Sequence, residues 1–185
     1  MTRVRAAAAG LTAVLLLAGC FAPGGGDQPG PPGPPLPTPQ ASLSAQVDGT
    51  VSLVRAALAK ANLQLDTPVV PYRPSEPVGL AAAPRAILQV TLPGAGAMDP
   101  DQGYVMVYDL TSTAVATDRG QELAAYLGSG FGQTNYPLDA QFAIAQVGGT
   151  IVFTWWSASR AADDALAQTA FDAVASVGQP IPVTK

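Results

Sequence analysis

The sequence predicts an α+β domain in which an N-terminal helix is followed by two strand–strand–helix units. Three observations support this prediction. Apolar residues recur at helical spacing near residue 50, two apolar segments flank Gly148-Gly149, and the order strand, strand, helix occurs twice. Two such units give a four-stranded antiparallel sheet with the helices packed on one face, because each element then buries its apolar side. The first helix either joins that layer or covers the other face.

The first predicted helix runs from about Leu43 to Gln64. Its apolar residues recur every three or four positions, which places them on one helical face. They are Val47, Val51, Val54, Leu58, Ala61 and Leu65. Ser42 or Ser44 precedes this segment, and a serine there can cap the helix.

A proline-rich arm, residues 67–85, follows this helix and carries a proline at every third position from Pro68 to Pro77. Period three matches the polyproline II helix. One interpretation is a ligand for the aromatic groove of another protein. The favoured interpretation is an ordered arm that wraps over the domain, with Val69, Val70 and Tyr72 as its anchors.

The first strand–strand–helix unit has predicted strands over Ala86–Leu92 and Gly103–Leu110, both rich in Val, Ile, Leu and Tyr. The loop between them contains Asp99-Pro100-Asp101, which lacks the downstream carboxylate of a calcium loop and is predicted to be a solvated turn. A helix over Ser112–Leu127 completes the unit.

The second unit begins with predicted strands over Ala140–Val147 and Thr150–Ser157. Gly148-Gly149 between them is typical of a tight hairpin turn. A last helix follows over about Ser159–Val177, with Asp163 and Asp164 in its first turn, where carboxylates favour the helix dipole.

Trp155 and Trp156 are adjacent in a strand, so their rings must point to opposite faces of the sheet. Trp155 shares a face with Ile151 and Phe153, which is predicted to be the core under the helices. Trp156 is a candidate binding residue, because an exposed Trp on an open sheet face would line an apolar groove. The alternative is that the first helix or the proline-rich arm covers it. Tyr72 is the second candidate on the binding surface.

The inventory of reactive residues argues against catalysis. The chain has no His and one Cys, which excludes His-based acid–base pairs, Cys-rich metal sites and internal disulfides. A formal charge of −4 argues against nucleic-acid binding. Asp109 and Asp118 could lie near each other, but no nucleophile or metal cage accompanies them. We expect no cofactor, no metal site and no enzymatic activity.

The first twenty residues have the pattern of an export signal. Arg3 and Arg5 precede an uncharged stretch from Ala6 to Gly19, which is too short to span a bilayer. Leu17-Ala18-Gly19-Cys20 resembles the lipobox of bacterial lipoprotein precursors. The resemblance implies that residues 1–19 are a cleaved signal peptide and that Cys20 carries a diacylglycerol group, the acyl chains of which anchor the protein in a membrane.

Residues 20–42 are rich in Pro and Gly and cannot form a helix or a strand, so they are predicted to be a disordered tether. Residues 43–185 are then one α+β domain, which resembles those of uncharacterised envelope lipoproteins. The predicted location is extracytoplasmic, on the cell membrane or on an outer membrane.

Three functions remain open at this stage. The leading one is a non-catalytic interaction module of the envelope, with a partner protein or an apolar ligand bound by the open sheet face or the proline-rich arm. The second is a carrier of a small apolar ligand or lipid, in a pocket lined by Phe142, Ile144, Phe153 and Trp155. The third is a hydrolase that depends on the carboxylates of Asp109 and Asp118.

Overall fold

The computed structural model of the protein describes residues 44–184. The predicted signal peptide, the lipidation site Cys20 and the tether lie outside the described residues. Within residues 44–184, no helix is both long and apolar enough to cross a bilayer.

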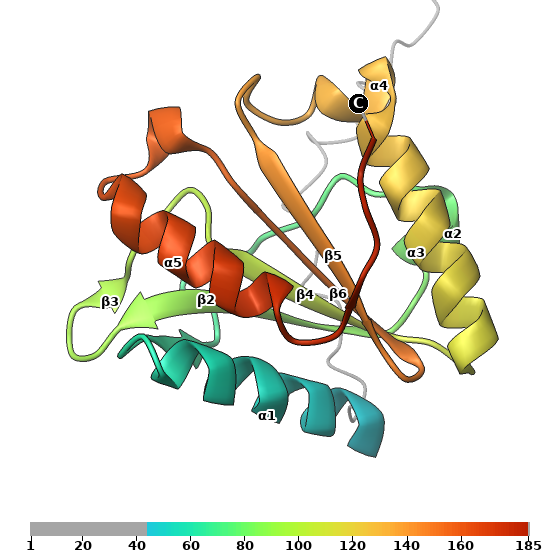
Figure 1. The fold of residues 1–185 in the computed structure, drawn as a ribbon, viewed down its shortest axis with the longest axis horizontal. Coiled ribbons are helices and arrows are strands. Elements are labelled where there is room, and N and C mark those ends of the chain that lie inside the picture. Colours follow the sequence, from blue (N-terminus) through green and yellow to red (C-terminus); the bar gives the residue numbers. More distant parts are fainter. Residues whose placement is uncertain (1–43, 185) are drawn as a thin grey trace, which may run out of the picture. The chain divides into compact units, whose positions relative to one another are not determined.

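Helices and strands are interspersed along the described chain (Figure 1). They are α1 (Ala45–Ala59), β1 (Gln64–Asp66), α2 (Val78–Ala81), β2 (Arg85–Leu92), β3 (Gly96–Ala97), β4 (Tyr104–Asp109), α3 (Thr113–Gly128), α4 (Gly130–Gln133), β5 (Gln141–Val147), β6 (Thr150–Trp156), a 3₁₀ turn (Ala158–Arg160), α5 (Asp164–Ala175) and β7 (Gln179–Pro180). The mixture of helices and antiparallel strands confirms the predicted α+β class.

All strands belong to one antiparallel sheet with the order β1-β2-β4-β6-β5-β7, and β3 pairs with β2 outside this path. The sheet has seven strands, so the prediction of four strands is wrong. The additional strands β1, β3 and β7 have only two or three residues each. Strands that short show no alternating pattern, and the sequence therefore gives no signal for them.

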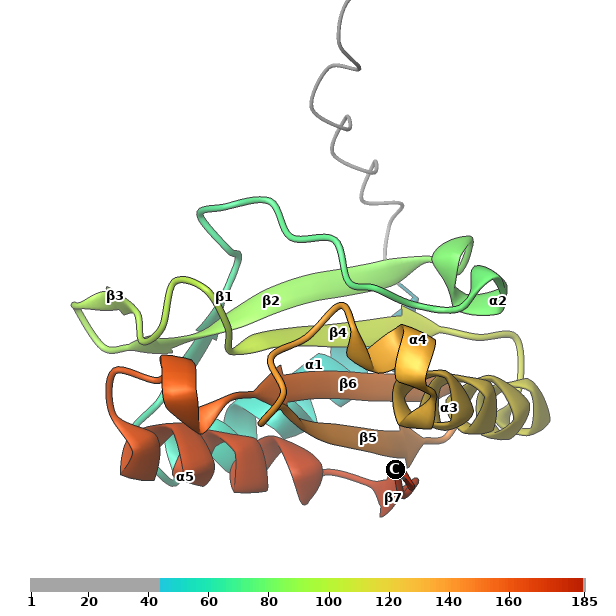
Figure 2. The same ribbon diagram turned by 90° about the horizontal axis from the view of Figure 1, so that it is seen from above.

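Helices cover both faces of the sheet (Figures 1 and 2). Val105 and Val107 of β4 point into the layer formed by α1 and α5, whereas Tyr104, Met106 and Tyr108 point into the layer that contains α3. The expectation that the helices of the two strand–strand–helix units share one face is therefore wrong, because α3 and α5 lie on opposite faces. The first helix covers the face opposite α3, which is one of the two placements that the sequence left open for it. The central strands carry apolar residues at odd and at even positions, so both faces of the sheet are apolar. Such a sheet needs helices on both faces to keep these residues out of water.

The helix caps follow local sequence rules. Ser44 caps α1 by accepting a hydrogen bond from the Val47 amide, and Asp163 caps α5 by accepting one from the Leu166 amide. The first helix ends at Ala59, before the predicted Gln64, because the chain turns at Asn62 with a φ of 57° and enters β1. The last helix begins at Asp164 because a 3₁₀ turn occupies residues 158–160.

The loop before β4 is more than the solvated turn that the sequence predicts. Asp99 is 4 % exposed and Gln102 is fully buried. The Gln102 Nε2 group donates to Asp99 Oδ2 at 2.6 Å, and Gln102 Oε1 accepts from the amide of Ser157 at 2.7 Å. This glutamine ties the loop to the end of β6, so the loop is part of the buried structure.

Candidate functional site

Trp156 does not line an exposed groove, because only 4 % of it is exposed. It packs in the apolar layer of α1 and α5, with Val54 and Ala170 among the members of that layer. Its ring lies so close to Gly103, whose φ is 79°, that a Cβ there would stand 2.8 Å from the indole. The groove hypothesis for Trp156 is therefore wrong, and the alternative that the first helix covers this residue is confirmed, with α5 as a second cover.

Tyr72 is half-buried and fastens the proline-rich arm to the sheet. Its ring stacks on Tyr104, with centroids 4.0 Å apart and planes within 5°. Its hydroxyl accepts a hydrogen bond from Trp155 Nε1 at 2.9 Å. The other two expected anchors are wrong, since Val69 is 91 % exposed and Val70 is 56 % exposed.

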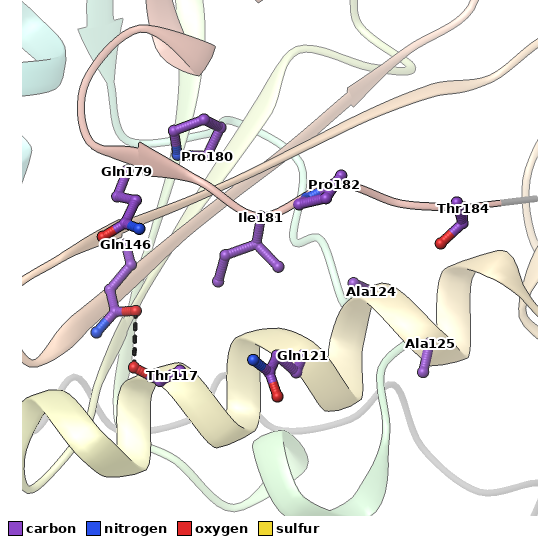
Figure 3. Close-up of a pocket in the computed structure, with 10 residues that line it drawn as sticks. All are labelled: Thr117, Gln121, Ala124, Ala125, Gln146, Gln179, Pro180, Ile181, Pro182 and Thr184. Atoms are coloured by element: carbon purple, nitrogen blue, oxygen red, sulfur yellow. Dashed lines mark hydrogen bonds between the residues drawn. The ribbon is translucent and has the colours of Figure 1, made fainter.

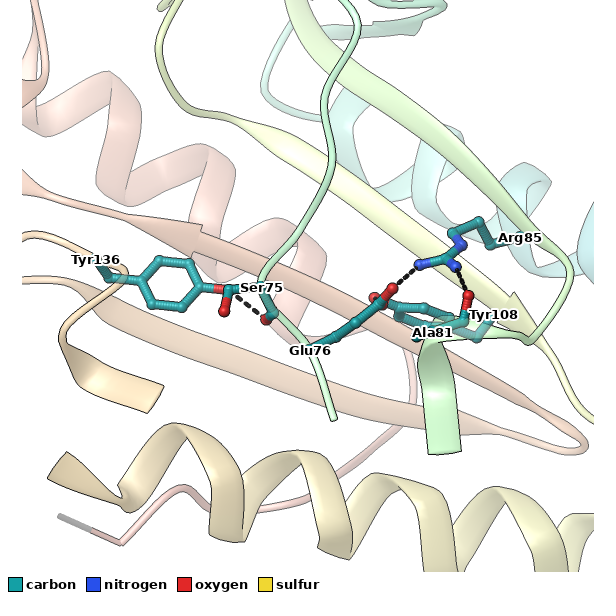
Figure 4. A network of polar contacts seen from close by, with 6 residues as sticks. All are labelled: Ser75, Glu76, Ala81, Arg85, Tyr108 and Tyr136. Carbon is teal, nitrogen blue, oxygen red and sulfur yellow. Dashed lines mark hydrogen bonds and ion pairs between the residues drawn. The ribbon is translucent and has the colours of Figure 1, made fainter. Parts of the chain in front are cut away.

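Glu76 makes the second attachment of the arm (Figure 4). Its carboxylate forms an ion pair with Arg85, at which the arm joins β2, and accepts a hydrogen bond from the Tyr108 hydroxyl of β4 at 2.5 Å. The Arg85 guanidinium also donates to the carbonyl of Ala81 and lies 5.3 Å from the centroid of the Tyr108 ring. The Glu76 side chain is 4 % exposed, so this ion pair is shielded from water.

Ser75 makes the third attachment. Its carbonyl accepts a hydrogen bond from the Tyr136 hydroxyl at 2.9 Å, as Figure 4 shows, and its own hydroxyl lies 2.7 Å from that of Tyr126. The chain has five tyrosines: Tyr72 belongs to the arm, and the other four contact it. Burial raises the pKa of Tyr72 to about 12 and raises the pKa of Tyr136 further, which keeps both hydroxyls protonated.

The arm crest, which we define as residues 67–71, differs from the rest of the arm. It contains the exposed Val69 and Val70, and Pro71 is exposed as well. By contrast, Pro74 is buried within the fastened part. In Figure 2 the segment between β1 and α2 bends away from the sheet before it returns to α2. The arm therefore combines a rigid base with an apolar, solvent-exposed loop.

A cavity of about 430 Å³ lies between α3 and the C-terminal residues (Figure 3). Its lining is uncharged and mixes amide, hydroxyl and apolar side chains. The lining residues are Thr117, Gln121, Ala124, Ala125, Gln146, Gln179, Pro180, Ile181, Pro182 and Thr184. The Thr117 hydroxyl donates to Gln146 Oε1 at 3.1 Å across one end of the cavity.

The residues expected to form a carrier pocket do not line this cavity. Ile144, Phe153 and Trp155 are at most 5 % exposed and belong to one packed layer with α3. The Tyr136 ring meets the rings of Phe142 and Trp155 edge to face, with centroids 4.9 and 5.3 Å apart. Side chains thus fill the place where an apolar ligand was expected.

Asp109 and Asp118 lie at the end of β4 and on the exposed side of α3, respectively. No hydrogen bond within residues 44–184 joins their side chains to each other. Across the same residues, no group of three or more His, Cys, Asp or Glu side chains is placed to hold a metal ion.

Glu76 and Arg85 are the residues of the site that the sequence did not reveal. A single acidic residue inside a proline-rich segment was the available signal, but its partners Arg85 and Tyr108 are fixed only by the pairing of β2 with β4. No protein-family model, curated protein or solved structure matches the chain.

Proposed function

We propose that the protein is a lipid-anchored, extracytoplasmic envelope protein whose domain is a non-catalytic interaction module. In this proposal the arm crest inserts into an aromatic-lined groove of a partner protein. The lipobox-like sequence before Cys20 supports the anchor, and the geometry of the proline-rich arm supports the binding role.

One observation carries the binding role: the arm is fastened at Tyr72, Ser75 and Glu76, while Val69 and Val70 remain exposed. An exposed apolar loop costs solvation energy unless a partner covers it. A loop that is already ordered loses little conformational entropy on binding. Pro68-Val69-Val70-Pro71 carries no charge and has the proline spacing that aromatic grooves recognise.

The charge of the mature chain supports a domain held away from the lipid. After removal of residues 1–19, seven basic residues remain against thirteen acidic ones, for a net charge of −6. An acidic domain is repelled by anionic headgroups, so its contact with the membrane is expected to be through the two acyl chains on Cys20.

Mass spectrometry of the N-terminal peptide tests the anchor. We expect a mature chain that begins at Cys20 and has the added mass of a diacylglycerol group. The Cys20→Ala variant should lack this mass and should leave the membrane fraction. Recovery of an unmodified Cys20 in a chain cleaved elsewhere would contradict the anchor and leave the binding role to be tested by itself.

Site-specific cross-linking in intact cells tests the crest. A photoreactive residue at position 70 should give one discrete cross-linked product, and Val69→Asp in the same chain should remove it by placing a charge in the groove. A photoreactive residue at position 78 is the matched control, because Val78 is 88 % exposed but lies in α2. Equal products from both positions, or a product unaffected by Val69→Asp, would contradict the crest as the binding surface.

The two other functions lack a supporting observation. A carrier of an apolar ligand needs space that Phe142, Ile144, Phe153 and Trp155 fill with their own packing. A carboxylate-dependent hydrolase needs Asp109 and Asp118 on one substrate, and within residues 44–184 no hydrogen bond joins their side chains to each other or to a common partner. The interaction module is therefore the function that we propose.

A further inference from the structure

The C-terminal residues form one edge of the sheet. β7 pairs with β5 in the register Ala145↔Pro180 and Gln146↔Gln179, and the Ile181 amide donates to the carbonyl of Ile144 at 2.9 Å. The pairing thus continues past β7 at least to Ile181. The Ile181 side chain enters the α3 layer, where it lies against Gly120.

Proline occupies the outward positions of this edge strand. Backbone groups of successive residues in an antiparallel strand point to opposite sides. Since Ile181 directs its amide toward β5, its neighbours Pro180 and Pro182 direct their backbone nitrogens away from the sheet. Both nitrogens lack a hydrogen, so this edge offers no N–H donor at either position to an incoming strand.

The opposite edge of the sheet is also restricted. β1 has three residues, and its Leu65 is paired in register with Val90 of β2. The Val90 amide donates to the carbonyl of Gly103, and the Val90 carbonyl accepts from the amide of Met98, so both groups point away from β1. The alternation therefore turns the backbone of Leu65 outward. Arg55 of α1 places its Nε atom 3.4 Å from the Leu65 carbonyl, so part of that short edge already has a partner within the domain.

We infer that Pro180 and Pro182 keep the β7 edge closed to strand addition, so that neither a second copy nor a partner peptide extends the sheet there. Unpaired edges are templates for strand pairing, and proline at outward positions is one way that proteins prevent it. The consequence for recognition is specific. Partners contact this domain through side chains and not by adding a strand at this edge.

The inference is tested by restoring the missing donors. Pro180→Thr/Pro182→Thr supplies two outward N–H groups and β-favouring side chains. Gln179→Thr is the matched control, because it adds the same side chain at an inward position and no new outward donor. The full chains, purified in a mild detergent, are compared by analytical ultracentrifugation over a range of concentrations.

We expect wild type and Gln179→Thr to remain monomeric and the double variant to form a dimer with a dissociation constant below about 1 mM. Circular dichroism establishes that each chain is folded. If the double variant is unfolded, the single variant Pro182→Thr, outside β7, replaces it and should show a weaker form of the same dimerisation. A folded variant with restored donors that stays monomeric, or a wild type that dimerises equally, would overturn the inference.

Discussion

Glu76 and Arg85 form an ion pair in which each side chain depends on the other. The Glu76 side chain is 4 % exposed and that of Arg85 is 12 % exposed, so neither charge is well solvated if its partner is removed. Breaking a buried pair on one side costs about 3–5 kcal/mol, whereas removal of both charges costs much less.

This dependence gives a double-variant prediction. Arg85→Met should lower the free energy of unfolding by about 3 kcal/mol, because the Glu76 carboxylate is left without its cation. Glu76→Gln/Arg85→Met should recover part of that loss, since no charge is left buried. Urea unfolding followed by circular dichroism measures both. Equal losses in the single and double variants would contradict the prediction that the unpaired Glu76 carboxylate causes the loss.

Asp139 gives a prediction at acidic pH. Its carboxylate accepts hydrogen bonds from the Ser159 amide at 2.7 Å and from the hydroxyls of Ser157 and Ser159. These bonds, that of the amide foremost, lower the pKa of Asp139 to about 2. A carboxyl whose pKa is lower in the folded state stabilises the protein above its unfolded pKa near 4.

The stability that the ionised Asp139 carboxylate contributes is expected to be lost as pH falls from about 4 through about 2, because the folded state must then take up the proton. Asp139→Asn should therefore be less stable than wild type at neutral pH, and the difference in stability between the two proteins, the gap, should narrow over this acidic range. Thermal unfolding at a series of pH values measures the gap. A gap that stays constant between pH 5 and pH 2 would contradict the role of the ionised carboxylate.

Single residues also show where sequence reasoning reaches its limit. Alternation along β6 correctly placed Trp155 and Trp156 on opposite faces, because that rule is local. It could not tell that α1 and α5 cover Trp156, since that depends on how distant elements pack. The same holds for Tyr72 of the arm, whose partners Tyr104 and Trp155 come from β4 and β6.

At the scale of elements, the attachment of the proline-rich arm to the sheet depends on tyrosine hydroxyls that stay protonated. Burial, the largest cause, raises the pKa values of Tyr72, Tyr108 and Tyr136. A phenol whose pKa is raised in the folded state contributes stability below its unfolded pKa near 10 and loses it as pH rises further. The folded arm thus opposes ionisation of these hydroxyls.

We therefore expect the protein to lose stability between about pH 10 and pH 12, with the tyrosinate absorbance appearing late and together with unfolding. Titration followed by absorbance and circular dichroism measures both. Ionisation of most tyrosines near pH 10 in the folded protein would contradict the fastening of the arm.

Elements were predictable in proportion to their length. The four long strands and the three long helices carry enough residues for a period to appear, and the structure has each of them within a few positions of its predicted range. β1, β3 and β7 are too short for that. Pairing with a neighbour defines them, and pairing is a property of the tertiary structure.

At the scale of the whole molecule, the sheet is shared by two apolar layers. α1 and α5 pack on one face and α3 packs on the other, and both layers include residues of β4 and β6. A strand that is buried on both faces cannot keep one layer ordered while the other melts without exposing apolar surface to water. The two layers are therefore expected to unfold together, as is usual for domains below about 150 residues.

Trp155 and Trp156 make this expectation measurable, because each reports on one layer. Trp155→Phe leaves the indole in the α1 and α5 layer, and Trp156→Phe leaves the one in the α3 layer. In each variant we expect fluorescence and circular dichroism to give the same urea midpoint. The comparison is made within each variant, so any loss of stability from the substitution itself cancels. A fluorescence change that precedes the loss of helix signal in only one variant would show that its layer unfolds independently.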